Sequence, residues 1–255
     1  MSWNFHKAVY LSIVAIFIQI SSNALAQNHP TFDRGFWNYW SDGKAELCGY
    51  DLVYPRYGQL RQGNAVTIFV TETFENEARV KVDFTTPNKQ STQFPVMKLN
   101  LIQDFPTGIY DYNMMSSLFV ALEPVNGYPA GSLTKASFSS QEWCGHVYQQ
   151  ILFDQTNVRY QLHSYFGGEA DQSNVIEANA KGISEDALLL WARGLLGPLL
   201  EPGQQQEVPL LRSMQWSRLR HQRLAWDQVT LARGQEKQRV EGPAGGLEVQ
   251  PDRAT

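Results

Sequence analysis

The feature that most constrains the fold is a succession of strand patterns between residues 36 and 166, with no helical period among them. Residues 79–84 alternate strictly between charged and apolar side chains, and residues 66–70 form a β-branched and aromatic run. A period of two is typical of a strand with one buried face. The polar residues 75–77 lie between the two runs, so the pattern predicts a hairpin.

Further runs of the same kind follow along the chain, with Gly, Pro, Asn or Asp in most of the intervals. They cover residues 96–102, 118–122, 133–138, 143–153 and 158–166. Strands that follow one another without helices favour an antiparallel sandwich or barrel over a parallel α/β sheet.

One helix is predicted at about residues 184–194. Ser184 is suited to the N-cap, acidic residues occupy the first turn, and residues 188–192 supply an apolar stripe. An open sheet with one apolar face must cover that face. We therefore expect a mainly β protein, an antiparallel open or partial barrel with this one α-helix packed on it.

The polar, Pro- and Gly-containing residues 201–206 predict a loop between two parts of the chain. Residues 27–200 form the β-rich domain with its helix. Residues 201–255 hold the loop and further strands, including a turn and strand pattern at 243–249. Because the sequence stops six residues later, this second part is expected to be an incomplete half, a shortened form of a longer relative.

Residues 1–26 have the organisation of a secretory signal peptide. A short polar start with Lys7 precedes an apolar run from Ala8 to Ile20, and Ala24-Leu25-Ala26 forms a small-x-small cleavage site. The apolar run is shorter than the roughly 20 residues of a membrane-spanning helix. We expect cleavage near Ala26 and a mature protein that is periplasmic or extracellular.

The charge balance argues against a nucleic-acid partner. Lys and Arg number 21 against 25 Asp and Glu, a formal net charge of -4, whereas nucleic-acid binding leaves a basic excess. The segment from Arg212 to Arg239 is locally basic. It indicates either a solvated exterior or an anion or headgroup site at a peripheral envelope contact. The oligomeric state is left open.

Export changes the meaning of the two cysteines, because thiols pair in oxidising compartments. Cys48 and Cys144 either form one disulfide or remain free, as buried thiols in a β-core do. The sequence leaves both alternatives open.

The segment most suggestive of a site is a hairpin of residues 142–153 and 158–166. A loop at 154–157 pairs Phe153 with Val158 and sets Tyr148 opposite His163. One face is then apolar and packs on the core. The other face collects the candidate ligand-binding residues Glu142, Cys144, His146, Tyr148, His163 and Tyr165.

A thiol, two imidazoles and a carboxylate are ligands that zinc or copper recruits. However, the chain has no pair of closely spaced cysteines and no His-Glu-x-x-His spacing. Three ligands strung along a flat hairpin would also have to bend toward one ion. We therefore expect no bound metal and no other cofactor.

Two other features of the sequence are candidate sites. The carboxylates Asp104 with Asp111, and Glu169 with Asp171, are candidates for glycoside chemistry, but acidic residues beside Gly and Pro more often form turns. The aromatic group at 36–44 either stacks sugars or closes one end of the sheet, and Asp42-Gly43 in it predicts a tight turn. Phosphate-loop and nucleophile-elbow motifs are absent from the sequence.

Four stretches carry a family resemblance: Trp40–Leu47, Tyr54–Gly58, Phe105–Tyr112 and Glu142–His146. With them the chain resembles a family of uncharacterised exported bacterial β-rich proteins, some of which carry the label septum formation inhibitor Maf. The Ser-x-Ser-Pro-Arg-Arg segment of the Maf nucleotide pyrophosphatases is absent here, so that label implies no chemistry. The end of the chain, from residue 243, is more loosely similar to exported half-barrel domains related to periplasmic lipoprotein carriers.

The sequence thus predicts an exported, non-enzymatic binding or envelope-associated protein that holds an apolar or lipid ligand between sheet and helix. The alternative is an extracytoplasmic hydrolase, either metal-dependent through Cys144, His146 and His163 or carboxylate-based.

Overall fold

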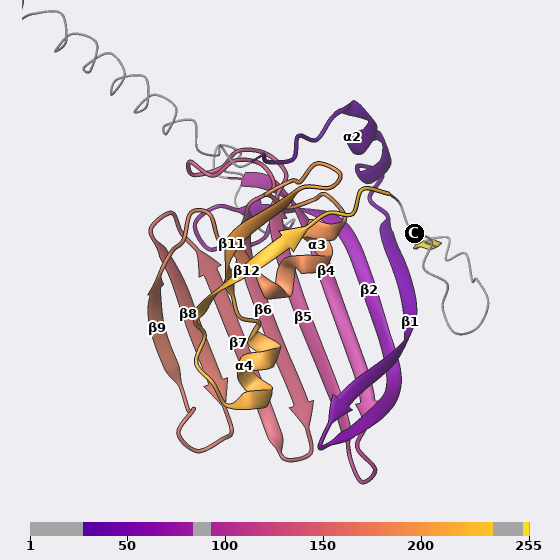
Figure 1. Ribbon diagram of the computed structural model, residues 1–255, viewed down its shortest axis with the longest axis vertical. Coiled ribbons are helices and arrows are strands. Elements are labelled where there is room, and N and C mark those ends of the chain that lie inside the picture. Colours follow the sequence, from indigo (N-terminus) through magenta and orange to yellow (C-terminus); the bar gives the residue numbers. More distant parts are fainter. Residues whose placement is uncertain (1–27, 84–92, 237–251, 255) are drawn as a thin grey trace, which may run out of the picture.

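The computed structural model describes residues 28–83, 93–236 and 252–254, and Figure 1 shows their arrangement. The predicted signal peptide and the strand pattern at 243–249 lie outside these residues. The elements are α2 (Arg34–Trp40), β1 (Ala45–Arg56), β2 (Gln59–Glu75), β3 (Val80–Lys81), β4 (Gln93–Pro106), β5 (Asp111–Ala121), β6 (Leu133–Glu142), β7 (Gly145–Phe153), β8 (Asn157–Ser164), β9 (Gln172–Glu177), β10 (Ile183–Ser184), the 3₁₀ helix η3 (Glu185–Ala187), α3 (Leu188–Ala192), β11 (Gln205–Leu211), α4 (Met214–Arg220), β12 (Trp226–Ala232) and β13 (Asp252–Ala254).

The main sheet is antiparallel and open. Its strands run in the order β13-β1-β2-β4-β5-β6-β7-β8-β9, and β3 pairs only with β2. Between β4 and β9 each strand is the neighbour of the next one in sequence, as short turn-rich connections favour. The sheet is not closed into a barrel. The prediction of a mainly β, antiparallel, open fold is therefore confirmed.

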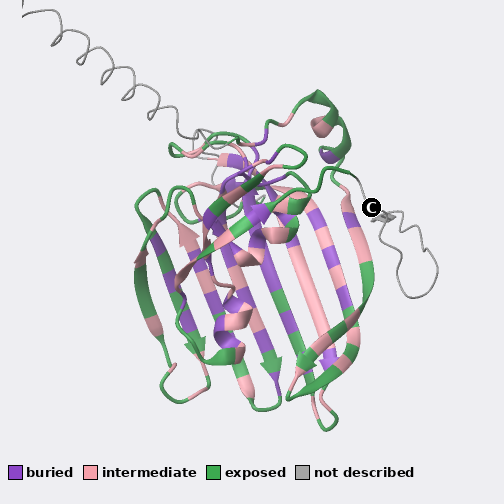
Figure 2. Cartoon of the chain, in the orientation of Figure 1, coloured by how far each residue is buried: buried purple, intermediate pink, exposed green. Residues whose placement is uncertain are grey.

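One face of this sheet is covered, and it holds the core. Figure 1 shows α3, α4 and the three-stranded sheet β10-β11-β12 lying over the same face, here named the covered face. Its strands alternate between buried and half-exposed residues, most regularly in β6, so every second side chain enters the core. Figure 2 shows the buried positions on the strands behind the helices. The largest fully buried side chains that the strands of the main sheet contribute to this core are Met97, Leu99, Phe105, Tyr112, Met114, Leu118, Phe138 and Ile151.

The predicted helix at 184–194 is present as η3 followed by α3. Leu190 is fully buried against the sheet, as the apolar stripe requires. Ser184 precedes η3, but its side chain makes no capping hydrogen bond. Arg193, just after α3, donates to Glu46 on β1 and so ties the helix to the sheet.

The predicted hairpin is present, since β2 pairs antiparallel with β3 across a turn after residue 75, but residues 66–70 are not the part of β2 that pairs with β3. The turn lies where expected, yet Lys81 pairs with Phe74 at the far end of β2. Residues 66–70 pair with β1 and β4 instead. The reason is length: β2 has 17 residues, so its middle lies far from the turn that ends it.

The part of the chain after residue 200 belongs to the same core as the part before it. Val208, Leu211 and Met214 are fully buried and pack in one cluster with Leu118 and Leu190. β11 also pairs in parallel with β10. The loop at 201–206 is therefore not a break in the core, and residues 205–232 complete the cover of the sheet.

The aromatic group before β1 forms α2. Asp33 caps this helix by accepting from Phe36 N–H at 2.8 Å, and Trp40 is buried at the edge of the core. The predicted turn follows: Gly43 has φ +77°, and Lys44 N–H donates to Asp42 at 3.0 Å. The group closes one end of the sheet, which is the plug that the sequence suggested.

Candidate functional site

The hairpin register predicted from sequence is confirmed. Phe153 pairs with Val158 and Tyr148 with His163, and Tyr165 N–H donates to His146 O at 3.2 Å. Val147, Ile151, Val158, Tyr160 and Leu162 are buried on the covered face. His146, Tyr148, His163 and Tyr165 share the opposite, outer face and line a shallow, open depression.

Glu142 does not belong to this outer set. β6 ends at Glu142 and β7 begins at Gly145, so residues 143 and 144 form a turn rather than a strand. Glu142 consequently lies on the covered face, where its carboxylate forms a buried ion pair with Arg218 of α4. The prediction was wrong because strand alternation was continued through a point where the chain reverses.

Cys144 is displaced by the same turn and is exposed. It is therefore no third ligand on the strand beside His146 and His163. His163 instead contacts Asp171, with 2.9 Å between Nδ1 and Oδ1. Within the described ranges no group of three His, Cys, Asp or Glu side chains is placed to hold a metal ion.

The two cysteines are both free. Cys48 lies on β1, and Cys144 follows β6, with β2, β4 and β5 between these strands. A disulfide needs Cα atoms within about 7 Å, which this separation in the sheet does not provide. Of the two alternatives, a disulfide or free thiols, the structure has Cys48 and Cys144 as free thiols.

Three of the four candidate carboxylates are engaged with neighbouring side chains. Asp104 accepts from Asn113 Nδ2 at 2.6 Å. Glu169 accepts from Ser164 at 3.1 Å and contacts His221, while Asp171 contacts His163. These acidic side chains are held by hydroxyl, amide and imidazole partners near the turns, as the turn interpretation expects.

A groove of about 940 Å³ lies between the sheet and the helices that cover it. The sheet contributes one wall through β1, β4 and β5, and η3, α3 and α4 contribute the other. We name it the inner groove. Its apolar lining residues are Tyr54, Leu101, Leu188, Leu189, Trp216 and Leu219.

Two acidic residues lie at the η3 end of the inner groove and hold the start of α4. Glu185 accepts from Ser213 N–H at 2.8 Å and Asp186 from Met214 N–H at 3.0 Å. Burial raises the pKa of Asp186 to about 7, although the hydrogen bond from Met214 opposes the shift. A carboxyl group that is half-protonated near neutral pH therefore joins η3 to α4.

A hydrogen-bonded tyrosine network lies at the other end of the groove. Tyr57 OH is 2.8 Å from both Tyr110 OH and Tyr112 OH, and Arg56 Nη2 donates to Tyr112 OH at 2.7 Å. The hydrogen bond with Tyr57, followed by burial, raises the pKa of Tyr110 to about 12. The β1–β2, β4–β5 and β6–β7 turns meet here, because they lie next to one another at one end of the sheet.

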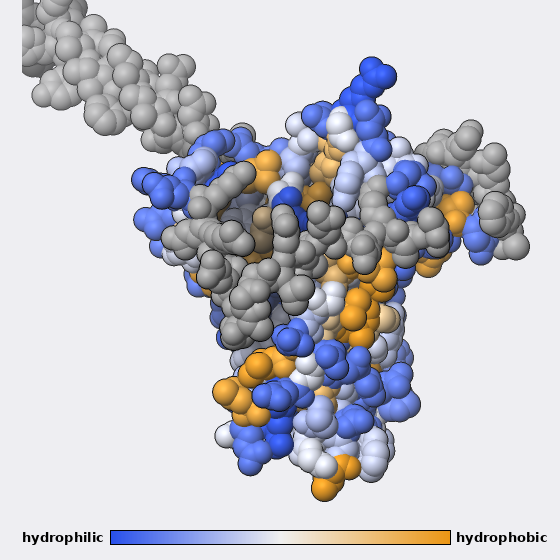
Figure 3. Space-filling model, turned by 90° about the vertical axis from the view of Figure 1, so that its right-hand side faces the viewer, coloured by the Kyte–Doolittle hydropathy of each residue, from blue (hydrophilic) through white to orange (hydrophobic). Residues whose placement is uncertain are grey.

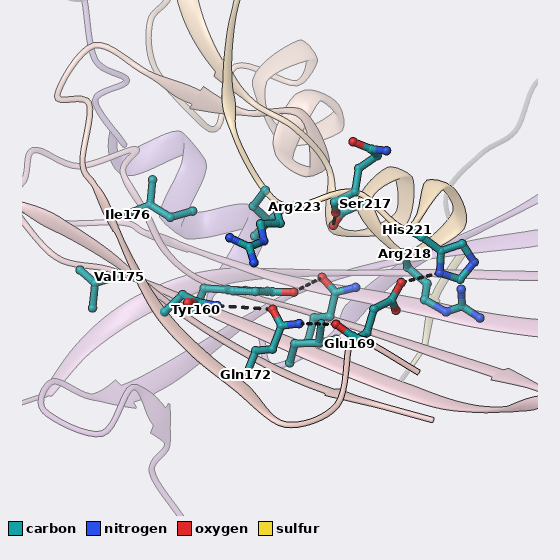
Figure 4. A pocket seen from close by; sticks show the side chains of 15 residues that line it. Tyr160, Glu169, Gln172, Val175, Ile176, Ser217, Arg218, His221 and Arg223 are labelled. Atoms are coloured by element: carbon teal, nitrogen blue, oxygen red, sulfur yellow. Dashed lines mark hydrogen bonds and ion pairs between the residues drawn. The ribbon is translucent and has the colours of Figure 1, made fainter. Parts of the chain in front are cut away.

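A second, smaller pocket of about 310 Å³ lies on the other side of α4. Figure 4 shows Ser217, Arg218, His221 and Arg223 on one side of it, and Tyr160 and Gln172 from β8 and β9 on the other. Several of its polar groups have partners, but Nε and Nη1 of the buried Arg218 have no hydrogen-bond partner among the described residues. Tyr160 OH donates to Gln149 at 3.3 Å, His221 contacts Glu169, and Arg218 is paired with Glu142.

Sequence reasoning missed α4, the element that separates the two hollows. Its signal was present: Ser213 caps the helix by accepting from Trp216 N–H at 3.0 Å. A seven-residue helix, however, spans only two turns, which is too short to show a clear apolar period. The basic residues of this segment are divided among separate roles, since Arg218 is buried and Arg212 pairs with Asp227.

The comparisons with known proteins give no relative: no family, no curated protein and no solved structure matches this chain at a significant level. In the described part of the chain, no helix is both long enough and apolar enough to span a lipid bilayer.

Proposed function

We propose that this protein is an exported, non-enzymatic binding protein that carries an apolar ligand, such as an acyl chain, in the inner groove. The observation that carries the proposal is the groove itself. Its volume of about 940 Å³ is at the upper end of the range of small-molecule sites, roughly 300–1,000 Å³.

The lining suits an apolar ligand with one polar end. Leu101 on the sheet faces the same space as Leu188, Trp216 and Leu219 on the cover, and each of these side chains is only half-buried. A ligand in the groove would remove the remaining apolar surface from water, which is favourable in proportion to its area. Arg56 lines the same groove at its tyrosine end and would meet the polar end of the ligand, whereas Glu185 and Asp186 lie at the opposite end.

The first test is binding of a dansyl-labelled fatty acid to purified protein in solution, followed by fluorescence. We expect saturable binding that Leu189→Asp weakens at least about tenfold, because a charge then lies in the apolar groove. Leu189 is 43% exposed, so this change leaves the fold intact. Leu101→Trp, which fills the groove, should act in the same direction.

The matched control is Ile109→Asp, the same kind of change at an 81% exposed position outside the groove. It should bind the probe like the unmodified protein. Native mass spectrometry of protein purified from its own envelope is the second test. If the probe fails to saturate, and several preparations carry no lipid or other apolar ligand, the proposal is wrong.

A further inference from the structure

The most exposed apolar side chains are concentrated at one end of the sheet. Within the described ranges, the four large hydrophobic residues with the greatest exposure are Ile109 (81%), Trp143 (78%), Leu60 (73%) and Tyr165 (71%). They lie at the β4–β5, β6–β7, β1–β2 and β8–β9 connections, respectively.

The strand pairing brings these four connections to the same end. Asn64 near the start of β2 pairs with Asp104 near the end of β4, Tyr112 pairs with Glu142, and Val147 pairs with Ser164. Figure 2 shows the turns at this lower end as exposed, and Figure 3 shows hydrophobic residues there. We name the set the rim: Tyr57, Leu60, Ile109, Tyr110, Trp143 and Tyr165.

The rim is continuous and held in place. Tyr57 and Tyr110 share a hydrogen bond of 2.8 Å, and the rings of Tyr110 and Trp143 are 6.5 Å apart. Tyr165 lies against Gly145, where a Cβ atom would come within 2.3 Å of its ring. The aromatic side chains therefore project from turns whose positions the network and the sheet determine.

We propose that the rim docks on the surface of a lipid bilayer and that the ligand of the inner groove exchanges with the bilayer there. This inference rests on the proposed function. Tyr57 belongs both to the rim and to the wall of the inner groove, together with Gly58, so the groove reaches the same end of the molecule as the exposed side chains.

The chemistry of the rim favours a bilayer. Trp and Tyr are the residues that collect at membrane–water interfaces, because each has an apolar ring and a polar atom. The side chains also stand on protruding turns, which can enter a soft interface. Charges of both signs lie around them: Asp171 is near His163, and Arg56 is engaged with Tyr112. Attachment should therefore depend on apolar insertion more than on anionic lipid.

The test is flotation of the protein with vesicles of pure phosphatidylcholine at low and high salt. We expect binding that 0.5 M salt leaves nearly unchanged, because screening weakens charge attraction and not apolar burial. The triple variant Ile109→Ser, Trp143→Ser, Tyr165→Ser should bind at least about tenfold more weakly. All three positions are more than 70% exposed, so the fold is preserved.

The matched controls are Val175→Ser and Val80→Ser, at positions 65% and 46% exposed that lie outside the rim; both should float like the unmodified protein. The dansyl-labelled fatty acid separates the two proposals. The triple variant should still bind it in solution, and Leu189→Asp should still float. Absence of flotation, salt-sensitive binding that requires anionic lipid, or a dimer that the triple variant disrupts would each overturn the docking proposal.

Discussion

The two faces of the main sheet differ in what a side chain on them can do. On the covered face, Glu142 and Arg218 form an ion pair whose side chains are 2% and 1% exposed, so each depends on the other for a counter-ion that water cannot replace. On the outer face, His163 contacts Asp171, but the two side chains are 61% and 82% exposed. We therefore expect the pair on the covered face to contribute to the stability of the fold and the pair on the outer face to contribute very little.

The largest effect is expected from breaking the buried pair. Arg218→Met should lower the free energy of unfolding by about 3–5 kcal/mol, because it leaves the Glu142 carboxylate buried without its counter-ion. Adding Glu142→Gln should recover a large part of the loss. Urea unfolding measures both, and Arg220→Met, an exposed position on the same helix, is the control with an expected change within about 0.5 kcal/mol. Equal stability of Arg218→Met and Arg220→Met would mean that the buried pair contributes no more to stability than an exposed arginine of the same helix.

A smaller, pH-dependent change in stability is expected from substituting Asp186, which lies where η3 meets α4 over the covered face. Its pKa is about 7 in the folded protein against an ordinary value of 3.8. Between these values the folded state binds a proton that the unfolded state has lost, so this group makes stability fall as pH rises from about 4 to about 7 and level off above. Asp186→Asn should therefore be more stable than the unmodified protein at pH 8, by roughly 2–4 kcal/mol, and similar to it at pH 4. Melting temperatures across this range measure the difference, and a gap that does not close at low pH would contradict the assignment.

The smallest effect is expected on the outer face. His163→Ala should change the free energy of unfolding by no more than about 0.5 kcal/mol, since an exposed pair contributes little and the imidazole is mostly in water. Denaturant unfolding in parallel with Arg218→Met gives the comparison directly. A loss of several kcal/mol would show that the His163–Asp171 pair does more than its exposure indicates.

Local sequence patterns predicted the structure correctly where a turn residue or an uninterrupted strand alternation determines the backbone conformation. The hairpin register around Phe153 and Val158 followed from a turn and a period of two, and Gly43 marked a turn with positive φ. The helix after Ser184 followed from its acidic first turn and apolar stripe. By contrast, the partner of residues 66–70 was predicted wrongly, because sequence proximity was taken for pairing and β2 runs on beyond its hydrophobic middle.

The candidate site was only partly accessible to the same reasoning. His146, Tyr148, His163 and Tyr165 do share a face, since their alternation is uninterrupted. Glu142 was assigned to that face in error, because a two-residue turn at 143 and 144 inverts the alternation on which the assignment depended. The residues that form the buried pair, the inner groove and the tyrosine network lie far apart in the sequence. No local sequence pattern therefore predicts that they come together.

The sequence by itself determined that this chain makes an open antiparallel sheet with one apolar face and a helix to cover it, because the alternation of side chains is a property of each strand alone. Only the tertiary structure decided which hollows remain beneath the cover. The inner groove lies where η3, α3 and α4 face β1, β4 and β5, and the rim lies where four turns distant in sequence reach the same end of the sheet. Both depend on how the elements pack on one another, which is a property of the whole fold and of no single segment.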